Sequence, residues 1–472
     1  MSRSLRLVIL IVVIGVHAVH WSRELAAGSP APLKVAVFQV DATPPVGSAL
    51  CNGGRPPVKA ITTPLSARGL VLLGAGDPIV LCAFDWVGIA NESHDYFREA
   101  LADAVGTSVE RVTVHTLHQH DAPGTDFATE RLLEEQGLGG QYSNPAFDRD
   151  VIRRLANAAK ASLPESVEVT HVGTGTGVVE RVASNRRILG PNGKVAIGRM
   201  SSSRKPEAKE APEGTIDPLV RMVSLWKNDR PVVVLSYYAT HPQSYYGKGL
   251  VNWDFVGMAR AQREAAVPGL PHIHFDGAGG NVAAGKYNDG SPEMRPILAD
   301  RLAAGMEQAW KAQQRVPVTA DDVQWAVVPT QVPVRDTLQE DELLRILTNN
   351  TAKTRDRIVA ARHLTFLRRC QADVPIDISC LRIGPARMLH LPGELFVEYQ
   401  LAAQEMRPDD FIAMAAYGQY GTGYIGTEIA YSQGGYEVGY VSRVAPEVEQ
   451  VLLNSIRALI EKTDLVQDRN VN

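Results

Sequence analysis

Short apolar runs rich in β-branched residues recur along the chain, and amphipathic segments of helical length separate them. The runs with the composition and length of strands are 34–40, 69–73, 79–84, 111–116, 219–226, 232–238 and 272–275. The segments with helical periodicity are 94–105, 147–162, 255–265, 296–312, 340–369 and 447–460. This alternation predicts a mixed α/β (α+β) protein in which layered mixed or antiparallel sheets are flanked by helices.

A turn signal and the chain length refine this picture. Asn228-Asp229-Arg230-Pro231 separates two predicted strands, which indicates a hairpin, so the chain is not a simple Rossmann ladder. The sequence shows no internal repeat. We expect one large domain over 33–463, with a solvated, charge-rich loop at 201–214 and a polar tail at 464–472.

Composition excludes several classes of protein. Apolar residues make up 45% of the 472 residues and charged residues 21%, as in a folded globular chain. Lys and Arg number 48 against 52 Asp and Glu, and the basic residues form no long block. The sequence therefore predicts no nucleic-acid partner.

The N-terminus has the pattern of an export signal. Arg3 and Arg6 precede the apolar run 7–16, which is too short to span a bilayer comfortably, since spanning takes about 20 residues. Small residues at 26–28 offer a cleavage point. We expect residues 1–28 to be a signal peptide, or else an uncleaved membrane anchor, and the protein to be exported to the periplasm or the extracellular space.

Four cysteines form an even set, which permits disulfides in an exported chain and leaves three pairings open. Cys370 and Cys380 would close the shortest loop. Cys82 lies in a strand-like run and is also suited to be a buried thiol, and Cys51 completes the set. No Cys-x-x-Cys metal pair occurs.

Histidines follow two of the predicted strands. His118 and His120 come after the run 111–116, and alternate residues of an extended chain face the same side about 6.5–7 Å apart. This is a spacing that metal ligands use, although a single pair of this kind is weak evidence, because satisfied structural histidines are common. His115, inside the strand, is expected to be a core residue or an outer partner of the site rather than a ligand. His241 follows the run 232–238, so a second strand end offers an imidazole.

Further polar positions stand beside turns. Glu394 precedes a helical pattern, where it would either oppose the helix dipole or bind a metal. Tyr424 and Tyr436 lie in glycine-rich segments, in which tyrosines often pack as lids. Asp254 is expected to cap the helix that follows it rather than to bind metal.

A phosphate-loop pattern is present but incomplete. Residues 280–286 fit G-x-x-x-x-G-K, yet Tyr287 stands where a Mg²⁺-binding Ser or Thr is needed. We interpret this segment instead as a loop whose backbone approaches an anion or oxyanion closely. Neither G-x-S-x-G nor H-E-x-x-H occurs, so a standard serine hydrolase or zincin is not supported.

In chain order, these motifs resemble those of the neutral/alkaline (non-lysosomal) ceramidases, zinc amidohydrolases that split N-acyl-sphingosines. The similar pieces are the opening Asp41–Gly47, the segment His118–Gly124, Asn185-Arg186, Pro392-Gly393-Glu394, and Tyr424 with Tyr436 twelve positions later. The resemblance covers most of the chain after the leader.

The resemblance implies a site. The zinc ligands would be His118, His241, Glu394 and Tyr424. The catalytic residues would be His120 as proton carrier, Asp121 as its orienting partner, and Arg186 and Tyr436 as contacts for the substrate or oxyanion. Zn²⁺ lowers the pKa of bound water to about 7, so metal-activated water would cleave an amide (N-acyl) or related ester bond.

The chain departs from the family at two points. The family's loop serine, often assigned as a nucleophile, corresponds to Ala283, which has no hydroxyl. The chain is also shorter than a family member with the usual C-terminal β-sandwich.

The substrate class therefore stays open. We expect a small-molecule or lipid substrate, with membrane contact through the N-terminal segment or a lipid. The alternatives are the same zinc scaffold acting on a non-ceramide polar substrate, a non-catalytic exported binding protein, and a nucleotide-binding enzyme.

Overall fold

The computed structural model describes residues 32–464. The expected leader or anchor, and the tail beyond residue 464, lie outside the described residues. Within residues 32–464, no helix combines the length and the apolar character that crossing a membrane requires.

Three larger sheets share one topology, which confirms the predicted mixed α/β architecture. In each sheet, four main strands pair in chain order. The first three are joined by two antiparallel pairings, and the fourth pairs in parallel with the third. The first contains β1 (Lys34–Asp41), β3 (Ser66–Gly74), β4 (Gly76–Phe84) and β6 (Val112–Thr116), with β8 (Val167–Glu168) at its edge. The second contains β9 (His171–Val178), β13 (Leu219–Lys227), β14 (Arg230–Tyr238) and β16 (His272–Asp276), with β18 (Gln314–Pro317) at its edge. The third contains β19 (Val323–Thr330), β20 (Ile376–Ile383), β21 (Ala386–His390) and β23 (Phe411–Ala415).

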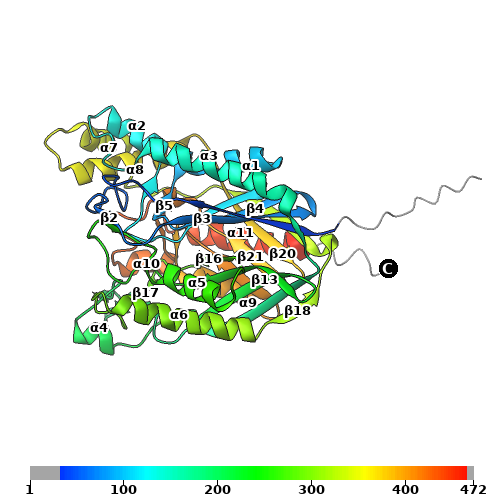
Figure 1. Ribbon diagram of the computed structural model, residues 1–472. Helices are drawn as coiled ribbons and strands as arrows, with labels where there is room; N and C mark the ends of the chain where they lie inside the picture. The colour runs from blue at the N-terminus through cyan, green and yellow to red at the C-terminus, as the bar shows by residue number, and fades with distance from the viewer. Residues whose placement is uncertain (1–31, 465–472) are drawn as a thin grey trace, which may run out of the picture. The chain divides into compact units, whose positions relative to one another are not determined.

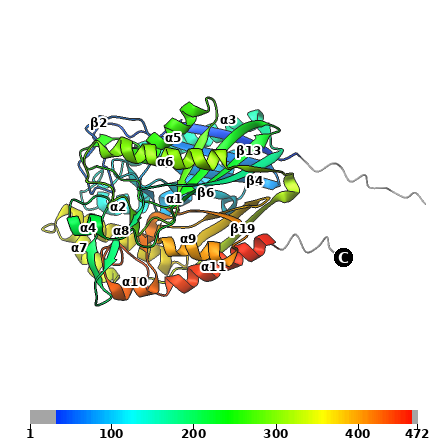
Figure 2. The ribbon, with the colours of Figure 1, turned by 90° about the horizontal axis from the view of Figure 1, so that it is seen from below.

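The helices repeat in the same way. One helix connects the two parallel strands of each sheet, and these are α1 (Asn91–Val105), α5 (Asp254–Ala266) and α9 (Val397–Met406). A longer helix comes after the second of the two parallel strands in each sheet, and these are α3 (Pro145–Ser162), α6 (Met294–Lys311) and α11 (Val448–Asp464). Figure 1 shows α1 and α3 on the first sheet, and Figure 2 shows α5 and α6 on one side and α9 and α11 on the other. The structure thus contains a threefold repeat that the sequence does not reveal.

Each sheet is buried on both faces. Its outer face packs on its own pair of helices, and its inner face packs in a core shared by all three sheets. Leu81 of β4, Leu235 of β14 and Met388 of β21 all belong to this shared core. Burial on both faces explains why the strands are near-continuous apolar runs rather than alternating ones.

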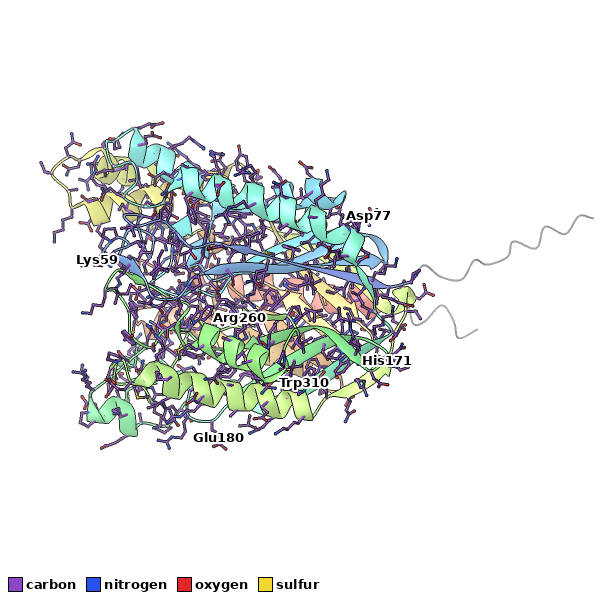
Figure 3. All side chains as sticks on the ribbon, in the orientation of Figure 1. Lys59, Asp77, His171, Glu180, Arg260 and Trp310 are labelled. Carbon is purple, nitrogen blue, oxygen red and sulfur yellow. The ribbon has the colours of Figure 1, made fainter. Side chains whose placement is uncertain are left out.

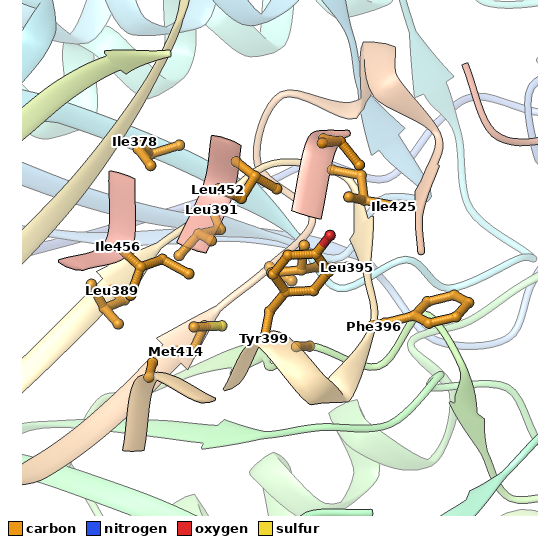
Figure 4. Packing of buried hydrophobic residues seen from close by; sticks show 14 of the residues in the cluster. Ile378, Leu389, Leu391, Leu395, Phe396, Tyr399, Met414, Ile425, Leu452 and Ile456 are labelled. Atoms are coloured by element: carbon orange, nitrogen blue, oxygen red, sulfur yellow. The ribbon is translucent and has the colours of Figure 1, made fainter. Parts of the chain in front are cut away.

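The last helix illustrates the outer packing. Figure 4 shows Leu452 and Ile456 of α11 beside Ile378 of β20 and Leu389 of β21, with Tyr399 of α9 close by. All five side chains are buried. Apolar residues of α11 recur at the helical period, so one stripe of the helix covers the third sheet.

The parallel strands carry the connecting loops to one end of the molecule. Figure 3 labels Asp77 and His171, near the starts of β4 and β9, at the end opposite Lys59. Short elements gather in the connecting loops: β2 (Ala60–Ile61), β5 (Gly88–Ile89), β7 (Gly124–Thr125), β10 (Ser184–Asn185), β11 (Arg187–Leu189), β12 (Val195–Gly198), β15 (Leu250–Val251), β17 (Val282–Ala283), β22 (Glu394–Leu395), β24 (Tyr424–Ile425), α2 (Phe127–Glu134) and α10 (Glu428–Gln433).

All seven predicted strands are present, and the 228–231 turn joins β13 to β14 as an antiparallel hairpin. The helix predicted over 340–369 is wrong, because the structure has two, α7 (Glu340–Thr348) and α8 (Thr354–Gln371). Between them the Asn349 carboxamide accepts a hydrogen bond from the Thr351 backbone, a local turn that competes with the helix.

Two further expectations meet a different outcome. The loop 201–214 is not wholly solvated, because it contains α4 (Pro206–Glu210) and buries Ser201 and Ala208. None of the four cysteines, all within the described residues, forms a disulfide, and Cys82 and Cys380 are buried thiols in strands.

The expectation that Asp254 caps α5 is also wrong, because Asp254 is the first helical residue and the N-cap position is Trp253, which makes no side-chain capping bond. The Asp254 carboxylate instead accepts from the Phe255 backbone N–H at 2.7 Å and lies 3.3 Å from the Arg295 Nε.

We expect Ile456→Ala to lower the free energy of unfolding by about 2–5 kcal/mol, because it leaves a cavity between α11 and the third sheet. Arg457→Ala, on the exposed side of the same helix, is the matched control and should change stability by less than about 0.5 kcal/mol. Denaturant titration followed by circular dichroism measures both. Equal effects of the two substitutions would contradict the packing described for α11.

Candidate metal centre

Four side chains predicted as ligands reach one point because they follow parallel strands. His118 lies two residues after β6 and His241 three residues after β14. Glu394 and Tyr424 lie in β22 and β24, which pair in parallel just beyond β21 and β23. Glu394 therefore belongs to a short strand, and the alternative role of opposing the dipole of α9 is wrong, since that helix begins at Val397.

The ligand atoms are close and buried. Those of His118, His241 and Glu394 all lie within 4.8 Å of one another. The His241 Nε2 is 3.0 Å from the Glu394 Oε2, and the His118 Nε2 is 3.4 Å from the same oxygen. The Tyr424 hydroxyl lies 3.1 Å from the His241 Nε2. This distance places the phenol beside the other three predicted ligands.

Hydrogen bonds set the protonation of both imidazoles. The Nδ1 of His118 is 2.7 Å from the Val87 carbonyl oxygen, and the Nδ1 of His241 is 2.6 Å from that of Gly279. A carbonyl only accepts, so each Nδ1 carries the proton, and each neutral ring presents its Nε2 lone pair to Glu394. Burial favours this neutral form, since it lowers the pKa of His241.

The backbone at His118 is unusual. Its φ is 58°, in the left-handed region that non-glycine residues avoid at a cost of about 1–2 kcal/mol. The His118 N–H donates to the Trp86 carbonyl at 2.8 Å, and the Gln243 side chain donates to the His118 carbonyl at 2.7 Å. These bonds offset the strain and fix the direction of the imidazole.

Glu394 is held as a carboxylate. The Tyr420 hydroxyl donates to its Oε1 at 2.7 Å, which leaves Oε2 facing the two imidazoles. Burial opposes the charge on this carboxylate, which a cation between it and the two imidazole lone pairs would offset. The Tyr417 ring stacks on His118 with 5.0 Å between centroids, which restricts the ring further.

Arg186 lies behind the ligands. It donates to the Tyr424 hydroxyl at 3.0 Å, and its Nε lies 3.1 Å from the Glu437 Oε1. Arg187 also pairs with Glu437, at 3.3 Å. Arg186 is not among the residues that line the cavity, so the structure places it against Tyr424 rather than at the surface a substrate would touch. Glu437 was not singled out from the sequence, although it directly follows Tyr436.

A cavity of about 170 Å³ opens beside the four predicted ligands. Three of them, His118, Glu394 and Tyr424, line it. His120 and Tyr436 line it too, and Tyr436 is 42% exposed. The His120 Nε2 is 3.3 Å from the His118 Nε2, and the His120 Nδ1 is buried without a hydrogen-bond partner among the described residues. An open space beside the ligands is what a catalytic metal site needs.

Asp121 does not contact His120. Its carboxylate accepts from the Gly247 backbone at 2.9 Å and lies 3.5 Å from the Asn252 amide, so it fixes the loop around those residues. The expectation that Asp121 orients His120 is therefore wrong on geometry. Its side chain lines a separate cavity, next to Trp253 and Tyr245.

Three other sequence features are also placed. His115 is a buried core residue, as expected, with its Nδ1 2.7 Å from the Ala416 carbonyl oxygen. Ala283 lies in β17, paired with Ser184 and fully buried. No helix follows Lys286 directly, and its amine donates to the Lys209 carbonyl at 2.7 Å, so this segment is not a phosphate loop.

No family model and no curated protein matches the sequence. Two solved structures are similar in fold. A ceramidase complexed with C2 has a TM-score of 0.66 and 14% identity, with 93% of this chain and 76% of that chain covered. The neutral ceramidase from Pseudomonas aeruginosa has a TM-score of 0.64 and 16% identity, with 93% and 75% covered. These likenesses show that the chain has the fold of the neutral ceramidases.

We expect the protein to bind one divalent cation per chain. His241→Ala should weaken that binding by more than about 100-fold, because loss of a direct ligand costs more affinity than loss of a residue that only hydrogen-bonds to a ligand. His171→Ala, at the opposite end of the molecule, is the control and should retain the ion. Metal analysis after dialysis and titration calorimetry with Zn²⁺ measure both. Full metal content in the His241→Ala protein would contradict the assignment.

Proposed function

We propose that the protein is a zinc-dependent hydrolase of the neutral ceramidase type, which cleaves an amide (N-acyl) or related ester bond. The observation that carries the proposal is the convergence of two imidazole lone pairs and a carboxylate oxygen beside an open cavity. Three acceptors facing one another repel unless a cation lies between them.

The donor set fits zinc. Two imidazole nitrogens, one carboxylate oxygen and one phenol oxygen form a nitrogen and oxygen set suited to Zn²⁺. His118, His241, Glu394 and Tyr424 would hold the ion. Bound zinc would activate a water molecule and polarise the scissile carbonyl.

The remaining side chains have distinct roles in this proposal. His120 lines the cavity beside His118, and its buried Nδ1 lacks a partner, so it is placed to carry the proton to the leaving group. Tyr436 projects into the cavity and would contact the substrate. Arg186, anchored by Glu437, would keep the Tyr424 hydroxyl oriented and favour its anionic form through the nearby positive charge.

The absence of a hydroxyl at Ala283 favours attack by water rather than by a serine at this position. We also propose, from the N-terminal sequence pattern, that the protein is exported. Membrane contact would arise through the N-terminal segment or a lipid substrate. A polar substrate other than ceramide is the second candidate, and the polar lining of the cavity favours it.

The zinc-loaded protein should hydrolyse N-acyl amides, and a chelator should abolish the activity until zinc is restored. His120→Gln should lower kcat by about 10²- to 10⁴-fold, the range for loss of a general acid or base, while the zinc content stays at one per chain. His171→Gln is the matched control and should keep wild-type kcat.

A panel of ceramide and short water-soluble amides and esters measures this activity. Zinc-replete protein that hydrolyses none of them would contradict the proposal and favour a binding protein with this fold.

A further inference from the structure

Four arginines line the cavity that contains the metal centre: Arg55, Arg355, Arg362 and Arg443. Among the described residues, none of the four lies within ion-pair distance of a carboxylate. The only carboxylate in the cavity lining is that of Glu394, which faces the imidazoles. The chain has a net charge of −4, so this excess of positive charge is local.

Arg443 is the most deeply placed of the four. It is 4% exposed, and its Nη1 donates to the Gly421 carbonyl at 2.7 Å. Its Nε is buried with no hydrogen-bond partner among the described residues. Burial, and then the nearby charge of Arg362, lower the pKa of Arg443 to about 9. A buried guanidinium without an anionic partner is unfavourable, because burial removes the water that would solvate its charge. A bound anion would compensate for that lost solvation.

Arg362 lines the same cavity as Arg443 and the metal centre. Its Cζ is 5.9 Å from the centroid of the Tyr420 ring, and the Tyr420 hydroxyl donates to Glu394. The charges of these arginines also affect His363. Burial, and then Arg443 and Arg362, lower the pKa of His363 to about 2. One tyrosine ring therefore separates the guanidinium from a metal ligand.

The other two arginines are exposed. Arg355 donates to the Tyr440 hydroxyl at 3.4 Å, and Arg55 lies over the Tyr246 ring at 4.8 Å. Positive charge thus runs from solvent-exposed side chains to a buried one within a single cavity. Such an arrangement raises the local concentration of anions and binds them with charge-assisted hydrogen bonds.

We propose that the substrate of this site carries an anionic group, a carboxylate or a phosphate, a few bonds from the scissile carbonyl, and that Arg362 and Arg443 bind it. This inference rests on the hydrolase function proposed above and specifies its substrate class. An uncharged two-chain lipid would cover the guanidinium groups without pairing them, which costs free energy. The planar, multi-donor guanidinium suits both carboxylate and phosphate.

Matched substrate pairs test the proposal with the zinc-loaded protein. N-acetylglycine is compared with N-acetylglycinamide, N-acetyl-phosphoethanolamine with N-acetylethanolamine, and a succinyl anilide with its methyl ester. The three pairs separate carboxylate from phosphate, and the amine side from the acyl side. In at least one pair, kcat/KM of the anionic member should exceed that of the neutral member by roughly 10- to 100-fold. Equal rates, or preference for the neutral member in every pair, would overturn the proposal.

Arg362→Gln should reduce this anionic-to-neutral ratio by roughly 10-fold or more, and Arg362→Lys should retain part of it. Arg345→Gln removes one exposed charge from α7 and is the matched control, with an unchanged ratio. Thermal melting checks that each variant is folded. A ratio that survives in folded Arg362→Gln protein would contradict the role of Arg362.

Binding separates this inference from the proposed function. Titration calorimetry compares N-acetylglycine with N-acetylglycinamide on wild-type and Arg362→Gln protein, both loaded with zinc. Selective binding of the anion that is lost in Arg362→Gln supports the anion site even if no substrate is hydrolysed. Hydrolysis without charge preference supports the hydrolase and overturns the anion site. Anion binding of undiminished affinity in Arg362→Gln protein overturns the anion site, because the paired guanidinium groups then contribute nothing.

Discussion

The site depends on two imidazoles whose Nδ1 protons are committed to backbone carbonyls. Because Val87 and Gly279 accept those protons, the Nε2 lone pairs of His118 and His241 are directed at the Glu394 carboxylate. Such a group of acceptors is unfavourable by itself and becomes favourable around a cation. The left-handed backbone of His118 directs its imidazole toward Glu394, and the hydrogen bond from Tyr420 to the Glu394 Oε1 leaves Oε2 facing the two imidazoles.

The fold supplies the geometry through its threefold repeat. Each sheet ends in a parallel strand pair, and a helix connects the two strands of each pair, so loops from all three sheets emerge at one end. The shared core fixes the sheets relative to one another, and with them the ligands. Residues separated by more than 300 positions, such as His118 and Tyr424, therefore meet, and only the order of the motifs along the chain indicates this in the sequence.

Much of the architecture follows from local patterns. Buried strands are apolar runs and the packed helices have apolar stripes, so the strands and most helices are predictable from the sequence. The position of His241 at the end of β14 is predictable for the same reason. The interruption between α7 and α8 has a local signal in the sequence, the pair Asn349-Asn350. The threefold repeat has none, because many unrelated apolar sequences can fill the same packing positions. Tyr420, Glu437, Arg362 and Arg443 reach the site only through tertiary packing, so their roles could not be predicted from their neighbours.

The proposed zinc centre and the proposed anion site share one cavity but rest on separate observations. The first depends on facing acceptors, the second on guanidinium groups that lack carboxylate partners. X-ray absorption at the zinc edge of the loaded protein tests the central claim most directly. The account predicts one ion with about two imidazole nitrogens and oxygen ligands, and loss of an imidazole contribution in His118→Ala. A spectrum without imidazole scattering, or one unchanged in His118→Ala, would contradict it.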